Sequence, residues 1–146
     1  MVNIRSADLK DLPAIIDLVI ELAVFEKEPE AVTATLEQYE EAFKDCVFEG
    51  LVAEKHGYIV GMAIYYITWS TWKGKMLYLE DLYVKESHRK LGIGQKLFDA
   101  FLNEAVIKKA KLTKWQVLDW NDPAVSFYLK NKATIEKNWW NAKKYI

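Results

Sequence analysis

The stretch MLYLEDLYVKESHRKLGIGQKLFDAFLNEAV, residues 76–106, decides the fold of this chain. Its first part, residues 76–84, is an apolar run typical of a strand that is covered on both faces. Its last part, from residue 93 onward, has apolar residues at the spacing of an amphipathic helix. Around the junction of the two parts lie two glycines, Gly92 and Gly94, with Arg89 and Lys90 just before them and Lys96 just after. The stretch therefore predicts a strand, a positively charged glycine loop and a helix, in that order.

The glycine loop has the features of an anion site. The first N–H groups of a helix have no partners within the helix, and together they carry about half a positive charge. Glycine lets an anion approach such a backbone closely. The P-loop pattern is absent, and Leu97 stands where the dinucleotide-binding fingerprint has its third glycine. The residues alone leave two interpretations open, an ordinary turn and a site for a pyrophosphate.

The rest of the chain continues as strand and helix patterns. Residues 6–26 and 35–45 have helical periodicity, with Asp8 or Asp11 as the cap of the first helix and Thr35 as the cap of the second. Six further segments complete the expected elements: strands at 2–5, 51–55, 58–68 and 114–120, a helix at 122–131 capped by Asp122, and one or two strands within 133–146. We expect an α/β fold of mixed α+β type, with a mixed sheet and helices on both faces, in a single domain of residues 1–146.

Composition excludes several classes of protein. The chain of 146 residues is 51% hydrophobic, which supplies a core for one domain. It lacks an apolar run of about 18 residues, so we expect no membrane span, and its N-terminus lacks the apolar block of a signal peptide. The single cysteine, Cys46, cannot form an intrachain disulfide, which fits a cytoplasmic location. The net charge of −1 argues against nucleic-acid binding, and we expect no metal site.

Charge is distributed unevenly along the chain. Residues 21–41 contain seven glutamates and one lysine, whereas residues 105–146 contain nine lysines and three acidic residues. Two solvated faces are the ordinary explanation for such charge runs. The alternative is a protein that binds a cation with one end and an anion with the other.

Four segments resemble a known family. RKLGIG, residues 89–94, is similar to the Arg/Gln-x-x-Gly-x-Gly/Ala motif with which GNAT acetyltransferases bind acetyl-coenzyme A. ELAVFEKEPE (residues 21–30), LYLEDLYV (77–84) and WNDPAVSFY (120–128) narrow the resemblance to the diamine and polyamine acetyltransferases, which include the spermidine/spermine and thialysine enzymes. The resemblance implies the GNAT fold, in which the central mixed sheet is mostly antiparallel.

The resemblance also implies residues that hold acetyl-CoA. The backbone of Leu82, Tyr83 and Val84 would pair with the pantetheine like an added strand. The pyrophosphate would lie on the glycine loop, whose residues are Arg89, Lys90, Leu91, Gly92, Ile93, Gly94 and Gln95. The pantetheine or the nucleotide end would contact the start of the last helix, at Asn121, Asp122, Pro123 and Ala124.

Glu80 and Asp81 interrupt the apolar run 76–84. Strict alternation along a strand places Asp81 on one face with Leu79 and Tyr83, and Glu80 on the other. Because burying a charge is costly, carboxylates in such a run indicate either a structural ion pair or a function. In the functional interpretation Glu80 faces the acceptor amine and takes up its proton, and Asp81 belongs to the substrate site.

Three further assignments rest on the resemblance. Tyr128 matches the general acid that protonates the departing thiolate, although its spacing from Ala124 also suits a helical core aromatic. Phe25 and Glu26 match residues that line the acceptor channel, although a polar loop is the ordinary explanation for this segment. The family usually has a glycine where Lys132 stands, and we expect Asn131 to take the left-handed conformation instead.

These observations predict an enzyme that moves an acetyl group from acetyl-CoA to a primary amine of a small cationic acceptor by direct transfer. Such an acceptor is a diamine, a polyamine or a thialysine-like amine. Two alternatives are a GNAT enzyme for another amine (an amino acid, an aminoglycoside or a protein lysine) and a non-catalytic acyl-CoA-binding module. The resemblance further implies a homodimer.

Overall fold

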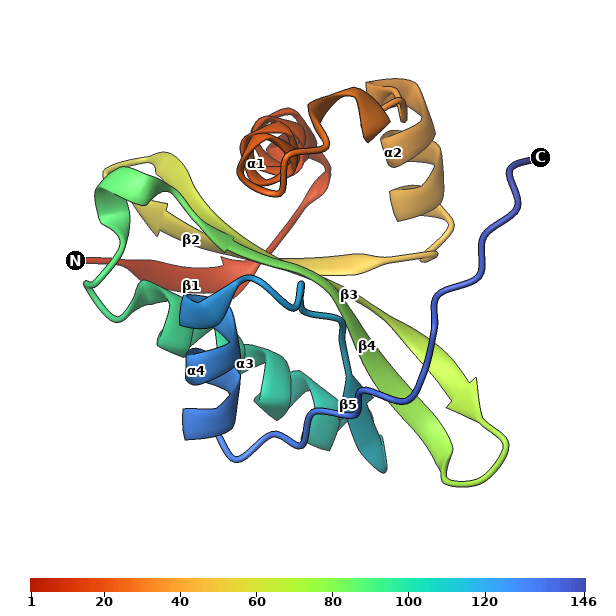
Figure 1. Cartoon of the computed structure of the whole chain (residues 1–146). Coiled ribbons are helices and arrows are strands. Elements are labelled where there is room, and N and C mark those ends of the chain that lie inside the picture. The colour runs from red at the N-terminus through yellow and green to blue at the C-terminus, as the bar shows by residue number, and fades with distance from the viewer. The chain divides into compact units, whose positions relative to one another are not determined.

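A five-stranded sheet is the centre of residues 1–115 in the computed structural model, which describes residues 1–146 (Figure 1). Its strands lie side by side in sequence order: β1 (Asn3–Ser6), β2 (Glu49–Lys55), β3 (Tyr58–Ser70), β4 (Gly74–Val84) and β5 (Leu112–Lys114). The first four strands pair antiparallel, and β5 pairs parallel with β4. The sheet is therefore mixed and mostly antiparallel, which confirms the predicted fold class.

The chain divides into two compact units, Met1–Trp115 and Gln116–Ile146. The first unit contains the whole sheet, and the second contains α4 (Asp122–Lys130). Short 3-10 helices occur only in the first unit, at Leu9–Asp11, Pro29–Ala31 and Glu86–His88.

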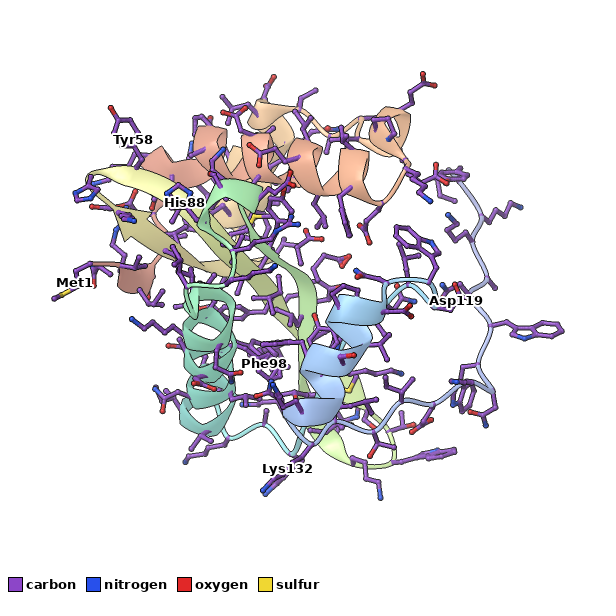
Figure 2. All side chains as sticks on the ribbon, turned by 60° about the vertical axis from the view of Figure 1, so that its left-hand side comes forward. Met1, Tyr58, His88, Phe98, Asp119 and Lys132 are labelled. Atoms are coloured by element: carbon purple, nitrogen blue, oxygen red, sulfur yellow. The ribbon has the colours of Figure 1, made fainter.

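Helices cover both faces of the sheet in the first unit. α1 (Leu12–Phe25) and α2 (Leu36–Lys44) lie on one face, and α3 (Ile93–Ile107) lies on the other (Figure 1). Seven buried residues form the core under α1: Leu12, Ile15, Leu18, Val52, Met62, Ile64 and Tyr83. On the opposite face Figure 2 shows Phe98 on the side of α3 that faces the strands. There Tyr65 of β3 packs against Phe101 of α3, with ring centroids 5.7 Å apart.

Local sequence explains where the first helices begin. Thr35 and Gln38 form a capping box at α2, in which each side chain accepts the other residue's backbone N–H. Asp8 caps the 3-10 helix that leads into α1. Asp11 makes no side-chain cap on α1, because its carboxylate binds Arg5 at 2.7 Å. Of the two predicted residues, Asp8 caps with its side chain, on the 3-10 helix, whereas Asp11 occupies the N-cap position of α1 without a capping hydrogen bond.

The ends of α4 differ from the prediction by one residue each. The N-cap is Asn121, whose Oδ1 accepts the N–H of Ala124 at 3.4 Å, and the predicted cap Asp122 is already helical. Both residue types can cap, so the sequence did not distinguish them. After the helix, Lys132 takes the left-handed conformation (φ 65°), so the expectation for Asn131 is wrong. The Asn131 amide instead donates to the carbonyl of Phe127 at 2.8 Å, in the last turn of the helix.

Two predicted strands are largely absent. β5 ends at Lys114, so residues 115–120 of the predicted strand 114–120 are not a strand, and residues 133–146 contain none. A strand requires a neighbour that supplies backbone partners, whereas a hydrophobic pattern reports only on the segment's own side chains. β5 finds such partners only at Met76, Leu77 and Tyr78 of β4.

Candidate functional site

β4 contains one extra residue, Glu80. Leu79 pairs with Tyr65 of β3 and Asp81 pairs with Ile64, which leaves Glu80 without a partner across the two strands. Such a β-bulge breaks the alternation of side chains along a strand. Tyr65 packs on α3, whereas Ile64 belongs to the core under α1. Asp81 therefore lies on the face opposite Leu79, and the prediction that these two residues share a face is wrong.

The bulge brings both carboxylates into one pocket. Glu80 and Asp81 line a cavity of about 260 Å³ on the α1 and α2 side of the sheet. The other lining residues are aromatic or aliphatic, namely Tyr39, Val47, Phe48, Ile64 and Tyr66. Neither carboxylate forms a salt bridge with a lysine or arginine. The alternative of a structural ion pair is therefore not found, and the pocket has a negative charge without a partner.

The two carboxyl groups have different surroundings. Glu80 is exposed, and its Oε2 accepts a hydrogen bond from the Tyr66 hydroxyl at 3.3 Å. Asp81 is partly buried and receives no hydrogen bond. Burial, followed by the charges of Glu80 and Glu26, raises the pKa of Asp81 to about 7. Near neutral pH the pocket therefore holds a carboxyl group that readily gains or loses a proton.

Phe25 and Glu26 lie at the C-terminal end of α1. Glu26 is the C-cap, and partial burial raises the pKa of its carboxyl group. Its charge acts on Asp81, so the structure brings three carboxyl groups toward the same region. The ring of Phe25 lies 5.5 Å from the guanidinium of Arg89.

The glycine loop is built as the beginning of α3. Gly92 is the N-cap in the left-handed conformation (φ 76°), and no side chain caps the helix there. A Cβ added to Gly92 would meet no atom within 4 Å, and one added to Gly94 would only touch Val84 at 3.9 Å. The backbone at the start of α3 is therefore open at Gly92, where a side chain would find space. Lys90 of this loop is also left-handed (φ 63°) and exposed.

Arg89 connects the loop to two neighbouring elements. Its Nε donates to the carbonyl of Val84 at 2.9 Å, and its guanidinium lies 5.2 Å from the ring of Tyr83. Together with the contact to Phe25, these interactions hold the end of β4 and the end of α1 against the loop. Arg89, which we predicted to bind the pyrophosphate, thus also contacts Phe25, which we predicted to line the acceptor channel.

The edge of β4 toward β5 is only partly used. β5 pairs with Met76–Tyr78, and no strand continues along Leu82, Tyr83 and Val84 on that side. An edge of this kind can accept an extended ligand as an additional strand.

The remaining predicted residues lie in the second unit. Asn121, Asp122, Pro123 and Ala124 form the beginning of α4, where Asn121 satisfies the backbone of Ala124. Tyr128 is the buried residue of this helix, and its ring packs edge-on against Phe127 with centroids 5.4 Å apart.

The aromatic walls of the pocket were not predicted from the sequence. One wall residue, Tyr66 of β3, stands opposite Tyr78 of β4, which does not line the pocket, and a register counted from the hairpin turn would have found this pair. Tyr39 and Phe48 reach the pocket only because α2 packs on this face of the sheet, and no sequence pattern predicted that packing. His88, labelled in Figure 2, lies in the turn after β4, where its Nδ1 meets the Oγ of the neighbouring Ser87 at 2.9 Å.

Comparison with known proteins identifies the class. Residues 12–132 match the Acetyltransferase (GNAT) family, so the chain belongs to this family. It is an acetyl-CoA-dependent N-acetyltransferase, and acetyl-CoA is the cosubstrate that the family uses. The open space beside Gly92 at the uncapped start of α3 fits a phosphate group of that cosubstrate.

Two curated relatives are similar over most of the chain. It is 36% identical over 137 residues to thialysine N-epsilon-acetyltransferase of Bos taurus, covering 87% of this chain and 81% of that protein. It is 32% identical over 149 residues to spermidine/spermine N(1)-acetyltransferase-like protein 1 of Homo sapiens, covering 94% of this chain and 21% of that protein.

Solved structures show the same fold. An aminoglycoside acetyltransferase from an uncultured soil metagenomic sample aligns with a TM-score of 0.84 and 23% identity, covering 99% of this chain and 96% of the other. A ribosomal-protein-alanine N-acetyltransferase from Brucella melitensis biovar Abortus 2308 aligns with a TM-score of 0.78 and 19% identity, covering 99% and 100%. None of the helices has the length and hydrophobicity required to span a membrane, and no cluster of metal-ligating side chains occurs.

Proposed function

We propose that the chain transfers an acetyl group from acetyl-CoA directly to a primary amine of a small cationic acceptor, which is a diamine, a polyamine or a thialysine-like amine. One observation carries the proposal: Glu80 and Asp81 share an aromatic pocket in which no lysine or arginine neutralises them. A negative pocket without a partner favours a cationic ligand, and the charge of Glu26 adds to it. The names of the curated relatives, thialysine and spermidine/spermine acetyltransferases, support the same acceptor class.

The aromatic walls of the pocket favour an alkyl ammonium group. Tyr39, Phe48 and Tyr66 contribute rings beside the two carboxylates. Aromatic faces attract cations, and they also cover the methylene groups between two charges. Two charges separated by a short alkyl chain match this combination better than a neutral amine does.

The proposal assigns the coenzyme residues as follows. The pyrophosphate lies on residues 89–95, the pantetheine runs along the edge of Leu82, Tyr83 and Val84 that no strand covers, and residues 121–124 contact the pantetheine or the nucleotide end. The uncapped N-terminus of α3 and the unpaired edge of β4 support the first two assignments. Both units then work as one domain of residues 1–146.

Proton transfer completes the mechanism. The acceptor arrives as an ammonium ion and must lose one proton before its nitrogen can attack the thioester carbonyl. Glu80 takes up that proton, directly or through a water molecule. When the C–S bond breaks, Tyr128 gives its phenolic proton to the departing thiolate. No enzyme nucleophile takes part, because the amine attacks the thioester itself.

The assay is a panel of acceptors followed by release of coenzyme A. It includes thialysine, linear diamines, spermidine, neutral monoamines of equal length, amino acids, an aminoglycoside and a lysine peptide. We expect the highest kcat/KM with a primary amine that has a second cationic group several atoms away. A neutral monoamine as the best acceptor would refute the assignment, and coenzyme binding without any turnover would indicate a binding module.

We further propose that the protein is a homodimer that works in the cytoplasm. Trp139, Trp140 and Tyr145 are all highly exposed in the chain, with 70%, 95% and 85% of their surface accessible, and exposed aromatics of this kind suit an interface. Cys46 is exposed and free, as in proteins of a reducing compartment. Light scattering on the purified chain tests the dimer, since a monomeric mass at assay concentration contradicts it.

A further inference from the structure

We propose that Tyr66 is a positioning residue, which holds the Glu80 carboxylate in the orientation needed to take the proton of the acceptor amine. The inference rests on the role of Glu80 proposed above. It begins with the bulge, because no residue of β3 is paired opposite Glu80 in the strand register and its side chain is exposed at the pocket. An exposed glutamate side chain has several accessible rotamers, so its backbone position alone does not fix its carboxylate.

One hydrogen bond restricts this freedom. The Tyr66 hydroxyl donates to Oε2 of Glu80 at 3.3 Å. An ionised carboxylate only accepts hydrogen bonds, so the second oxygen, Oε1, remains available for the ammonium group of the acceptor. Oε2 of Glu80 thus fixes the orientation of the carboxylate, and Oε1 binds the substrate.

Tyr66 is itself held in place. Its ring is stacked on that of Tyr78, with centroids 5.3 Å apart and an angle of 26° between the ring planes. The two residues are paired directly across β3 and β4. A donor that is anchored by a strand and by a stacked ring can orient a flexible carboxylate, whereas a mobile donor would follow it.

The Tyr66 hydroxyl remains a donor throughout the working pH range. Burial, followed by the charge of Glu80, raises the pKa of Tyr66 to about 12. The phenol therefore keeps its proton and does not act as a competing base. Six ionisable groups approach this part of the pocket from α1, α2, β3 and β4, and they are Glu26, Tyr39, Tyr66, Tyr78, Glu80 and Asp81. The Asp81 carboxyl group receives no hydrogen bond, so Tyr66 orients the carboxylate of Glu80 and leaves that of its neighbour Asp81 unrestrained.

The test compares Tyr66→Phe with Tyr78→Phe. Each variant loses one hydroxyl and keeps its ring, but only the Tyr66 hydroxyl bonds to Glu80. With each amine that the acceptor panel identifies, thialysine first, we expect Tyr66→Phe to lower kcat about tenfold with a smaller change in KM. Tyr78→Phe should behave as the wild type.

The same variants in a Glu80→Gln background separate the possible failures. If Tyr66 acts through Glu80, Tyr66→Phe has no further effect on kcat or on the pH profile of Glu80→Gln. If Glu80→Gln is slow but Tyr66→Phe matches the wild type, the positioning role is refuted and the proposed function stands. If Glu80→Gln is fully active, or no amine is acetylated, the role of Glu80 fails and the inference fails with it. An equal loss in Tyr66→Phe and Tyr78→Phe would indicate a structural role and would also refute the inference.

Discussion

Replacing Asp81 by asparagine should stabilise the protein above neutral pH. The side chain lies partly buried beside Glu80, and burial is the main reason that its pKa rises from the ordinary 3.8 to about 7. Between these two pH values the folded protein holds a proton that the unfolded chain has already lost. The free energy of unfolding therefore falls as the pH rises from about 4 to about 7, and above pH 7 the full penalty of the buried charge remains.

The magnitude follows from the two pKa values. Each pH unit between them corresponds to about 1.4 kcal/mol, so the ceiling is about 4 kcal/mol for the ionised carboxylate at pH 8. The pocket is open to water, and solvent and side-chain relaxation reduce such penalties, so we expect about 2 kcal/mol for Asp81→Asn. For a chain of this length this corresponds to a rise in Tm of about 6 °C at pH 8. At pH 4, where the carboxyl group is protonated in the folded state, the gain should nearly vanish.

The assay is thermal unfolding of wild type and Asp81→Asn at several pH values between 4 and 8, without acetyl-CoA or amine. Glu30→Gln is the matched control, because it removes the same charge from an exposed position outside the pocket. The reasoning is refuted if the difference in Tm between Asp81→Asn and wild type does not grow with pH. It is also refuted if Glu30→Gln gives the same pH-dependent gain, because net charge would then be the cause.

Three further predictions concern the proposed site. Gly92→Glu should abolish the rise in Tm caused by acetyl-CoA, whereas Gly57→Glu should keep it. Gly57 is the matched control because both glycines are left-handed (φ 76° and 80°) with open surroundings. A full rise in the Tm of Gly92→Glu on addition of acetyl-CoA would contradict the phosphate loop. Tyr128→Phe should lower kcat by about 10²–10⁴-fold at unchanged coenzyme affinity, and an unchanged single-turnover rate would leave Tyr128 as a packing residue. Glu26→Gln should raise KM for diamines more than for monoamines, most strongly at low ionic strength, whereas Glu30→Gln at an exposed position should not. The measurement is initial rates with both kinds of amine. Equal changes in KM for diamines and monoamines would exclude Glu26 from the acceptor channel.

Several features of the fold follow from local sequence. Thr35 and Gln38 provide a cap that needs no other part of the chain, and α2 begins where they predict. His56 and Gly57 adopt left-handed conformations at the predicted turn between β2 and β3. The glycine loop starts α3 for the same reason, because Gly92 takes a backbone conformation that other residues rarely adopt.

The candidate site was only partly predictable. Glu80 and Asp81 stood out because charge is costly in an apolar strand, yet the periodicity of one strand assigned them to opposite faces. That periodicity assumes one partner for each residue, and the bulge at Glu80 removes this condition. The register between β3 and β4 depends on both strands, so it is not contained in the pattern of either one.

The sequence by itself determined the order of the elements, the helix starts set by local caps, and the glycine loop at the beginning of α3. All of these depend on hydrogen bonds and backbone conformations within a few residues. Only the tertiary structure decided that β5 stops at Lys114, that Arg89 lies against Phe25, and that Tyr66 bonds to Glu80. These features depend on groups that are distant in sequence and meet only after the sheet has formed, because strand pairing and side-chain contacts are set by the neighbour as much as by the segment.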